Sequence, residues 1–435
     1  LNVDSYFYTL LISLIPAISI LFKSKDIKKV SIYFKIQTVI LGYFLLPAII
    51  SLPYYLSIYN ITFIDAYFEA ISGFTSTGFT IFDNIKHLDE SLIIWRSSSQ
   101  WIGGLYFLFS ILLLIDIFDD NLKKTLTNFL SFNSSEIFKQ FFKILVFYIF
   151  LTFIIFIIYN IFEIRSFNSL NLALTVVSSG GFLPSNNLAS ILNSEIKTIM
   201  FSLTLLVSFF GLFFSYNIFV IRNKGLKSVQ EDIYLLFYLF FLYSIFFIFS
   251  DKNIDFHYIF LAISSSVSNV GISLDKTTQN FSFIFLMIII IGGSFFSTSS
   301  GLRFIKIYSL VKFSINELIS HSKPKNIFLN KLAFSDKNMN IEDFYKYFLT
   351  IIIFLFSLII LSSILTISGY NVEESFKLSI LTLMNTVNST MTGLNGFNFE
   401  ETNYFLKYSL ILFMIIGRVE LLTVLILCKK FFFKN

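Results

Sequence analysis

Long apolar runs without charged residues alternate along this chain with short polar stretches that are rich in lysine. Residues 144–162 and 347–365, for example, contain no charge at all. Because a helix needs about 20 mostly apolar residues to cross the hydrocarbon core of a membrane, such runs predict transmembrane helices. A further apolar run, residues 5–22, is preceded by Asp4 and followed by lysines, the reverse of a signal peptide's polarity. We therefore expect a first membrane span there.

After that first span, one pattern of segments recurs four times. Each copy has a long apolar helix, a short and less apolar helix, a turn rich in Ser, Thr, Gly and Asn, a polar loop, and a second long apolar helix. The four turns are expected at residues 75–79, 178–182, 268–272 and 390–394. The pattern predicts an N-terminal span at 1–30 and repeats at 31–118, 119–228, 229–343 and 344–435.

The short helices cannot cross a membrane, yet each leads into polar backbone at membrane depth. Such backbone is tolerated only where it is buried in protein or lines a water-filled cavity. Four copies of this unit therefore predict four re-entrant loops that meet on one axis. The expected fold is an all-α polytopic membrane protein, with four helix–pore-loop–helix repeats in pseudo-fourfold arrangement around a central ion pore and one extra N-terminal span.

The distribution of charge predicts the orientation of the repeats. The segments that join them, and the C-terminal tail, are basic; they contain Lys123, Lys124, Lys139, Lys143, Arg222, Lys224, Lys227, Lys312, Lys323, Lys325, Lys331, Lys337, Lys429, Lys430 and Lys434. The segments that follow the short helices are more acidic, with Asp83, Asp89, Glu90, Asp275, Glu400 and Glu401. We expect the basic segments in the cytoplasm and the four turns open to the outside, where acidic residues would concentrate cations.

Composition narrows the choice of function. Only 14% of the residues are charged and 55% are hydrophobic, whereas soluble domains carry about 25% charged residues. The chain has one cysteine, Cys428, and three scattered histidines, His87, His257 and His321. These numbers argue against an internal disulfide framework, a metal centre and a membrane-embedded enzyme. The net charge of +5 is modest and reflects loop lysines, so we expect no nucleic-acid partner and no bound cofactor.

One glycine in each turn is a candidate for an ion-selectivity filter. A dehydrating cation can be coordinated by backbone carbonyl oxygens, and aiming these at one axis requires backbone angles that glycine adopts most easily. A glycine after a helix is also a common C-cap, but four matched copies favour the filter. The candidate pairs are Thr77–Gly78, Gly180–Gly181, Val270–Gly271 and Thr392–Gly393. In the fourth copy, Gly396 remains an alternative to Gly393.

A second candidate element interrupts the return helix of the third repeat. Apart from two phenylalanines, residues 292–301 are all Gly, Ser or Thr. This density breaks a membrane helix, and we interpret the segment as a gate beneath the filter, with Gly292, Gly293, Ser297, Thr298 and Gly301 as its key residues. The alternative is close helix packing through small residues.

Arg418 lies in the largely apolar run 408–427. A charge at membrane depth is costly and is a functional candidate by default. Facing a pore, Arg418 would repel cations and could pin the gate segment by donating to its carbonyl oxygens. The alternative is a structural pair with Glu420 or another acid. Arg96, Gln100 and Trp101 open the first return helix, where interfacial anchoring and a role at the pore mouth are equally compatible with the pattern.

Four segments resemble the motifs of one family. Residues 66–78 (AYFEAISGFTSTG) are similar to a first pore helix and filter, and residues 92–104 (LIIWRSSSQWIGG) to the helix that follows. Residues 291–303 (IGGSFFSTSSGLR) are similar to an intramembrane gate loop, and residues 417–421 (GRVEL) to the last helix, whose arginine restrains that loop. Together they resemble the TrkH/KtrB/HKT superfamily of potassium transporters, and the TrkH branch most closely.

The resemblance implies potassium uptake through a gated, channel-like pore in the bacterial cytoplasmic (inner) membrane. It also implies a homodimer and a cytosolic nucleotide-binding regulatory subunit of the TrkA/KtrA type. Glycine at all four filter positions goes with potassium selectivity in this family, and potassium would be the substrate. The alternative function is a sodium- or proton-coupled cation symporter, which should carry acids within its spans.

The chain departs from the family pattern in the gate segment, the fourth filter and the third turn. The gate segment has Phe296 and Ser299-Ser300 where relatives often carry glycines, and the fourth filter lacks the usual Gly-Pro-Gly. In the third turn, Asn269-Val270 stands where a threonine pair is expected.

Overall fold

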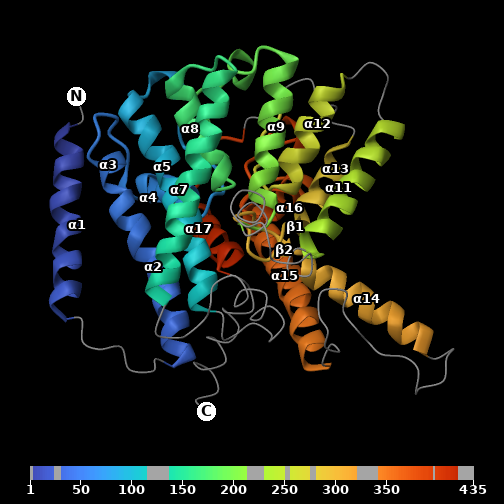
Figure 1. Cartoon of the computed structure of the whole chain (residues 1–435). Helices are drawn as coiled ribbons and strands as arrows, with labels where there is room; N and C mark the ends of the chain where they lie inside the picture. The colour runs from blue at the N-terminus through green and yellow to red at the C-terminus, as the bar shows by residue number, and fades with distance from the viewer. Residues whose placement is uncertain are drawn as a thin grey trace.

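The fold is described from a computed structural model of the chain, over residues 3–23, 31–114, 137–212, 230–249, 255–274, 281–320, 341–394 and 397–419. These parts are helical apart from turns and one pair of two-residue strands. Helix α1 (Val3–Lys23) covers the expected first span and stands at the edge of the bundle, where it packs against the first helices of the next unit (Figure 1).

The four repeats follow the same order of elements. The first comprises α2 (Ile32–Ile50), α3 (Leu52–Tyr55), α4 (Phe63–Phe74), η1 (Ile85–His87) and α5 (Glu90–Leu113). The second comprises α7 (Ile137–Ile161), α8 (Ser166–Val177), η4 (Leu188–Ser190) and α9 (Glu195–Phe209). The third comprises α11 (Gln230–Phe249), α12 (Phe256–Val267), α13 (Ser282–Ile290), β1 (Ile291–Gly292), β2 (Leu302–Arg303) and α14 (Phe304–Ser320). The fourth comprises α15 (Ile341–Ile367), α16 (Val372–Leu383), η7 (Thr390–Thr392) and α17 (Tyr404–Arg418).

The expected boundaries between repeats can be compared with these elements only in part. Those after residues 30, 118 and 228 adjoin or fall within undescribed segments. The boundary expected between residues 343 and 344 falls inside the first turn of α15, because that helix begins at Ile341. Most of the basic inter-repeat residues also lie outside the described residues, as do Asp275, His321, Gly396, Glu420 and Cys428.

Within the described residues, four helices are long and apolar enough to cross a membrane, at Ile32–Tyr55, Lys139–Ile161, Glu231–Phe249 and Phe344–Ile367. Each is the first helix of one repeat. The short helices α4, α8, α12 and α16 have 12 residues each, which corresponds to about 18 Å at a rise of 1.5 Å per residue. A hydrocarbon core of about 30 Å exceeds that length, so the short helices end inside the membrane.

The repeats close into a ring. Helix α5 packs against α8 of the second repeat, α9 against α12 of the third, α13 against α16 of the fourth, and α17 against α4 of the first. The first and third repeats therefore face each other across the ring, as do the second and fourth. Helix α14 points away from the bundle at the lower right of Figure 1.

The return helix of the third repeat is interrupted. Helix α13 ends at Ile290 and the next helix begins at Phe304, and between them β1 pairs in parallel with β2, Ile291 opposite Leu302. The chain thus leaves the helical path where Gly, Ser and Thr are densest. We call residues 291–303 the interrupting loop.

Candidate functional site

The turns after the four short helices share one backbone conformation. In each, an amide bonds back to the carbonyl five residues earlier: Thr77 to Ser72 at 2.9 Å, Gly180 to Thr175 at 2.8 Å, Val270 to Ser265 at 3.1 Å, and Thr386 to Leu381 at 2.9 Å. The residue before that amide is left-handed in every case: Ser76 at φ 60°, Ser179 at 55°, Asn269 at 58° and Asn385 at 48°. This is the hydrogen-bond pattern that commonly ends a helix.

The residue that follows this amide occupies the same place in each of the four turns, which we call the matched position. The four residues at the matched positions lie close together. They are Gly78, Gly181, Gly271 and Val387. A Cβ atom built on Gly78 would lie 2.8 Å from the Cα of Gly181, and one built on Gly181 would lie 2.6 Å from the Cβ of Val387. One built on Gly271 would lie 2.6 Å from the carbonyl oxygen of Val387. Three turns therefore converge as expected, and the fourth does so through residues 384–388.

The fourth turn lies at residues 384–388 and not at the expected Thr392 and Gly393. Thr392 ends η7, and Gly393 caps it with φ 71°, so this glycine serves as the C-cap of a short 3₁₀ helix. The nearest neighbours of a Cβ on Gly393 would be the Nζ of Lys377 at 3.0 Å and the side chain of Ser282, not the other three turns. The alternative, Gly396, lies outside the described residues.

Two asparagine side chains independently support residues 384–388 as the equivalent of the other three turns. The side-chain amide of Asn269 donates to the carbonyl of Ile289 in α13 at 2.7 Å, and that of Asn385 donates to the carbonyl of Met414 in α17 at 2.9 Å. Each asparagine thus ties its turn to the return helix of its own repeat. Asn385 also donates to Thr77 at 3.0 Å, which joins the fourth turn to the first.

The ligands that this convergence offers are backbone carbonyl oxygens. Among the described residues, the backbone carbonyls of the matched positions and of the residues just before them accept one hydrogen bond, from the Val387 amide to the Val270 carbonyl at 3.4 Å. No group of three or more His, Cys, Asp or Glu side chains gathers in the described part of the chain. Buried carbonyls with free lone pairs suit a dehydrated monovalent cation.

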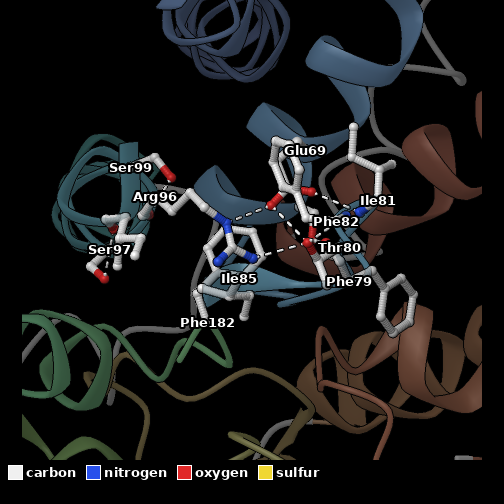
Figure 2. A network of polar contacts seen from close by, with 12 residues as sticks. Glu69, Phe79, Thr80, Ile81, Phe82, Ile85, Arg96, Ser97, Ser99 and Phe182 are labelled. Carbon is white, nitrogen blue, oxygen red and sulfur yellow. Dashed lines mark hydrogen bonds and ion pairs between the residues drawn. The ribbon is translucent and has the colours of Figure 1, made fainter. Parts of the chain in front are cut away.

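A buried ion pair supports the first two turns. The Arg96 Nε donates to Glu69 at 2.8 Å, and the two side chains are 1% and 0% exposed. The second oxygen of Glu69 accepts the amide of Ile81 at 3.0 Å, and Arg96 donates to Thr80 at 2.9 Å. Figure 2 shows Arg96 between Glu69 and the ring of Phe182, whose centroid is 4.2 Å from the guanidinium. The pair thus fixes the segment that follows the first turn.

The neighbouring polar residues of α5 also lie behind the turns. Gln100 accepts the amide of Phe182 at 3.3 Å, directly after the second turn, and its side chain fills the space where a Cβ on Gly180 would project. Trp101 donates to Thr152 of α7 at 2.9 Å. Arg96 and Gln100 are therefore buried supports of the turns and not surface anchors.

The interrupting loop lies directly beneath these turns. Thr298 donates to the carbonyl of Val177 at 2.8 Å and lies 3.4 Å from the hydroxyl of Ser179 in the second turn. Gly293 is packed against the carbonyl of Phe209 so closely that no Cβ fits there. Gly301 has φ 81° and faces Gly292 across the strand pair.

Charged side chains hold this loop from within and from α11. Arg303 donates to the carbonyls of Ser294 at 3.1 Å and Ser299 at 3.0 Å, and to the hydroxyl of Ser297 at 3.2 Å. Glu231 accepts the amide of Phe295 at 3.0 Å and the hydroxyl of Ser294 at 3.2 Å. Each of these bonds ties loop backbone or a loop hydroxyl to a charged group, and such bonds are stronger than neutral ones.

Arg418 connects the loop to the first turn. Its guanidinium donates to the hydroxyl of Ser300 and, at 3.3 Å, to that of Ser76. The side chain is 1% exposed and its Nε has no partner among the described residues. Its guanidinium carbon lies 4.3 Å from the ring centroid of Phe107. A cavity beside it is lined by Ser300, Arg303, Lys306 and Arg418, among others. The alternative partner, Glu420, lies outside the described residues.

Sequence reasoning missed three features of this site. Val387 was missed because glycine was taken as the marker of each turn, although Asn385-Thr386-Val387 stands in register with Asn269-Val270-Gly271. Glu231 was missed because it opens an apolar run, where an acid resembles a helix-start residue. The partner of Arg96 was not predicted, although Glu69 lies within the segment 66–78 that resembles a first pore helix.

Comparison with known proteins finds relatives that are similar to this chain over most of its length. No family model matches it. An uncharacterized cation transporter of Methanocaldococcus jannaschii is 23% identical over 88% of this chain and 80% of its own. The Trk system potassium uptake protein TrkG of Escherichia coli is 24% identical over 86% of this chain and 80% of its own. The crystal structure of the potassium transporter TrkH from Vibrio parahaemolyticus superposes with a TM-score of 0.84 at 19% identity, over 98% of this chain and 91% of that one.

These likenesses confirm three expectations. The structural match confirms the all-α polytopic membrane fold. The relatives and the shared fold confirm the resemblance to the TrkH/KtrB superfamily and a multi-pass protein of the inner membrane.

Proposed function

We propose that this chain takes up potassium ions across the cytoplasmic membrane, through a pore whose narrowest part is the ring of four turns. The observation that carries the proposal is the convergence of Gly78, Gly181, Gly271 and Val387. Among the described residues, the backbone carbonyls at and just before these positions accept no hydrogen bond apart from the one that Val387 donates to Val270. Relatives that match most of the chain are named for potassium uptake. The filter proposed here differs from the expected one, since it has three glycines and a valine.

The interrupting loop is the proposed gate. It lies beneath the turns, and Arg418, Arg303 and Glu231 hold it there. Small residues at 292, 293 and 301 allow the backbone to pack closely, and the anchors are polar contacts that can break and re-form. Gly292, Gly293, Ser297, Thr298 and Gly301 are therefore proposed gate residues, with Arg418 as the latch to the first turn.

A coupled symporter is less well supported. Acids do lie on the membrane helices of the proposed pore, namely Glu69 on α4 and the pair Glu231–Asp232 at the start of α11. Glu69 is paired with Arg96, Glu231 binds loop backbone, and Asp232 accepts the amide of Gly211 at 2.9 Å. These acids are bound to protein groups away from the matched positions, which favours support and gating over coupling.

Lipid, a second copy of the chain and a cytosolic regulatory subunit of the TrkA/KtrA type are the proposed partners. Large apolar side chains on the outer faces suit lipid, for example Phe237, Phe240 and Phe247 of α11, which are 68%, 73% and 75% exposed. The homodimer and the nucleotide-binding subunit rest on the resemblance to the superfamily.

The function is tested by potassium uptake in a bacterium that lacks its own uptake systems. The chain is produced together with a TrkA/KtrA-type subunit, and growth and potassium content are measured on low-potassium medium. We expect growth to be restored. If the chain is present in the membrane at normal levels and potassium content stays at that of the empty strain, the proposal is wrong.

A further inference from the structure

The fourth turn carries a side chain where the other three have none. Val387 occupies the position matched to Gly78, Gly181 and Gly271, as the shared hydrogen bonds and the left-handed residue two positions earlier establish. A valine there adds three carbons at the level where carbonyl oxygens converge. Any role of this side chain in ion passage rests on the proposed function, because it presupposes that the ring is the ion path.

This side chain reaches across the ring. The second and fourth repeats are opposite each other in the order of packing, yet the Cβ and Cγ1 of Val387 lie 2.6 and 3.0 Å from the position of a Cβ on Gly181. The hydrogen of Gly181 therefore points at the valine side chain. Glycine at 181 makes room for Val387.

The backbone conformation of the ring also differs between its two pairs of facing turns. Gly78 and Gly271, which face each other, have φ of 86° and 81°. Gly181 and Val387, the other facing pair, are absent from the described residues with positive φ, so Val387 keeps a conformation that a β-branched residue accepts. Its amide also binds the Val270 carbonyl at 3.4 Å, which uses an oxygen otherwise available to an ion.

We propose that Val387 is a specificity-determining residue that narrows the path between the second and fourth turns. A cation passes only when this side chain moves aside, and the remaining width favours a smaller monovalent cation over a larger one. An apolar side chain contributes no ligand, so its effect is steric. It limits the rate and discriminates by size.

The test compares potassium and caesium flux into liposomes that contain the purified chain. Val387→Ala removes the two branching methyl groups, which lowers the steric barrier to the ion, and should raise potassium flux about tenfold, equivalent to about 1.4 kcal/mol. It should also raise the caesium-to-potassium flux ratio. Val387→Ile should lower both fluxes. Val372→Ala, at an exposed site on α16 of the same repeat, is the matched control and should behave as the unchanged chain.

The outcomes separate the role of Val387 from the proposed function. If the unchanged chain carries neither cation, the proposed function fails. If the unchanged chain carries potassium, two results for folded Val387→Ala would show that Val387 is not the constriction. One is an unchanged or lower potassium flux, and the other is a higher flux with the same caesium-to-potassium ratio. If the alanine variant does not fold, Val387→Ile decides, and an unchanged flux there overturns the inference.

Discussion

At the scale of single residues, Arg418 touches two parts of the site that must separate if the interrupting loop is to move. It holds Ser300 of the loop and Ser76 of the first turn at once. Its burial next to Phe107 removes it from water, so its bonds are stronger than they would be at the surface. We propose that Arg418 acts in two ways, as a donor that pins the loop and as a charge that repels cations.

Substitution of Arg418 separates these two roles. Arg418→Ala removes both and should raise potassium flux on the order of tenfold, since hydrogen bonds to charged groups contribute about 1.5–3 kcal/mol. Arg418→Lys keeps the charge but loses the planar fork of donors, so its flux should lie between those of the unchanged chain and the alanine variant. Flux in liposomes measures both, and a lowered flux in a folded alanine variant would instead indicate a structural ion pair.

The pair Glu69–Arg96 shows how burial changes the value of an ion pair. Glu69→Gln should lower the free energy of unfolding by roughly 3–5 kcal/mol, because it leaves a buried charge without its partner. Glu90→Gln is the matched control: Glu90 pairs with Arg165 at the same 2.8 Å, but both side chains are more than half exposed. Such a pair contributes about 0–1 kcal/mol. Thermal unfolding in detergent compares the two, and equal losses would contradict the supporting role of Glu69.

At the scale of elements, the interrupting loop is held from within and by two helices. Arg303, its last residue, binds it from within, Glu231 from the start of α11, and Arg418 from the end of α17. Its flanking helices α13 and α14 are therefore coupled to the first and fourth repeats. Release of one anchor should weaken the hold of the others, because all act on the same short segment.

Glu231→Ala tests this coupling. The change removes the acceptor for Phe295 and Ser294 and should raise potassium flux by a factor on the order of ten. The double variant with Arg418→Ala should show much less than the product of the two single effects, since groups that act on one segment are not additive. Multiplying effects would mean that the two residues hold separate structures.

Much of the element order was visible in the sequence. Apolar length predicts the spanning helices, and the density of Gly, Ser and Thr predicts the break in the third return helix. Three of the four turns followed from the glycine pattern. The fourth did not, because Thr392-Gly393-Leu394 imitates Thr77-Gly78-Phe79 while the equivalent position is a valine. Twelve-residue short helices, counted from the start of each, would have led to Asn385.

Other features could not be read along the chain. Glu69 and Arg96 are 27 residues apart, and Asn385 bonds to Thr77 across 308 residues. Such contacts depend on how the repeats close into a ring, and no local periodicity records that closure. The sequence shows which polar side chains lie within apolar segments, and the fold determines which of these side chains are in contact.

At the scale of the whole molecule, closure of the ring explains why the turns converge. Each repeat packs against the next, and the last packs against the first, so four short helices end around one point inside the membrane. The apolar outer faces suit lipid, and the polar backbone that a lipid-exposed loop could not tolerate is enclosed. We propose that this enclosed point is the ion path, and the roles of the filter, the gate and Arg418 all depend on it.

The most direct test of the proposed ion path compares two glycines that both have a left-handed backbone, one within the ring of turns and one outside it. Gly78 has φ 86° within the ring and Gly393 has φ 71° outside it, so serine strains the backbone similarly at both. Potassium flux into liposomes, and its ratio to sodium flux, are measured for Gly78→Ser, Gly393→Ser and the unchanged chain. We expect Gly78→Ser alone to lower potassium flux and its preference over sodium. Equal effects at both positions, or a larger loss of preference in Gly393→Ser, would mean that the ions do not pass through the ring.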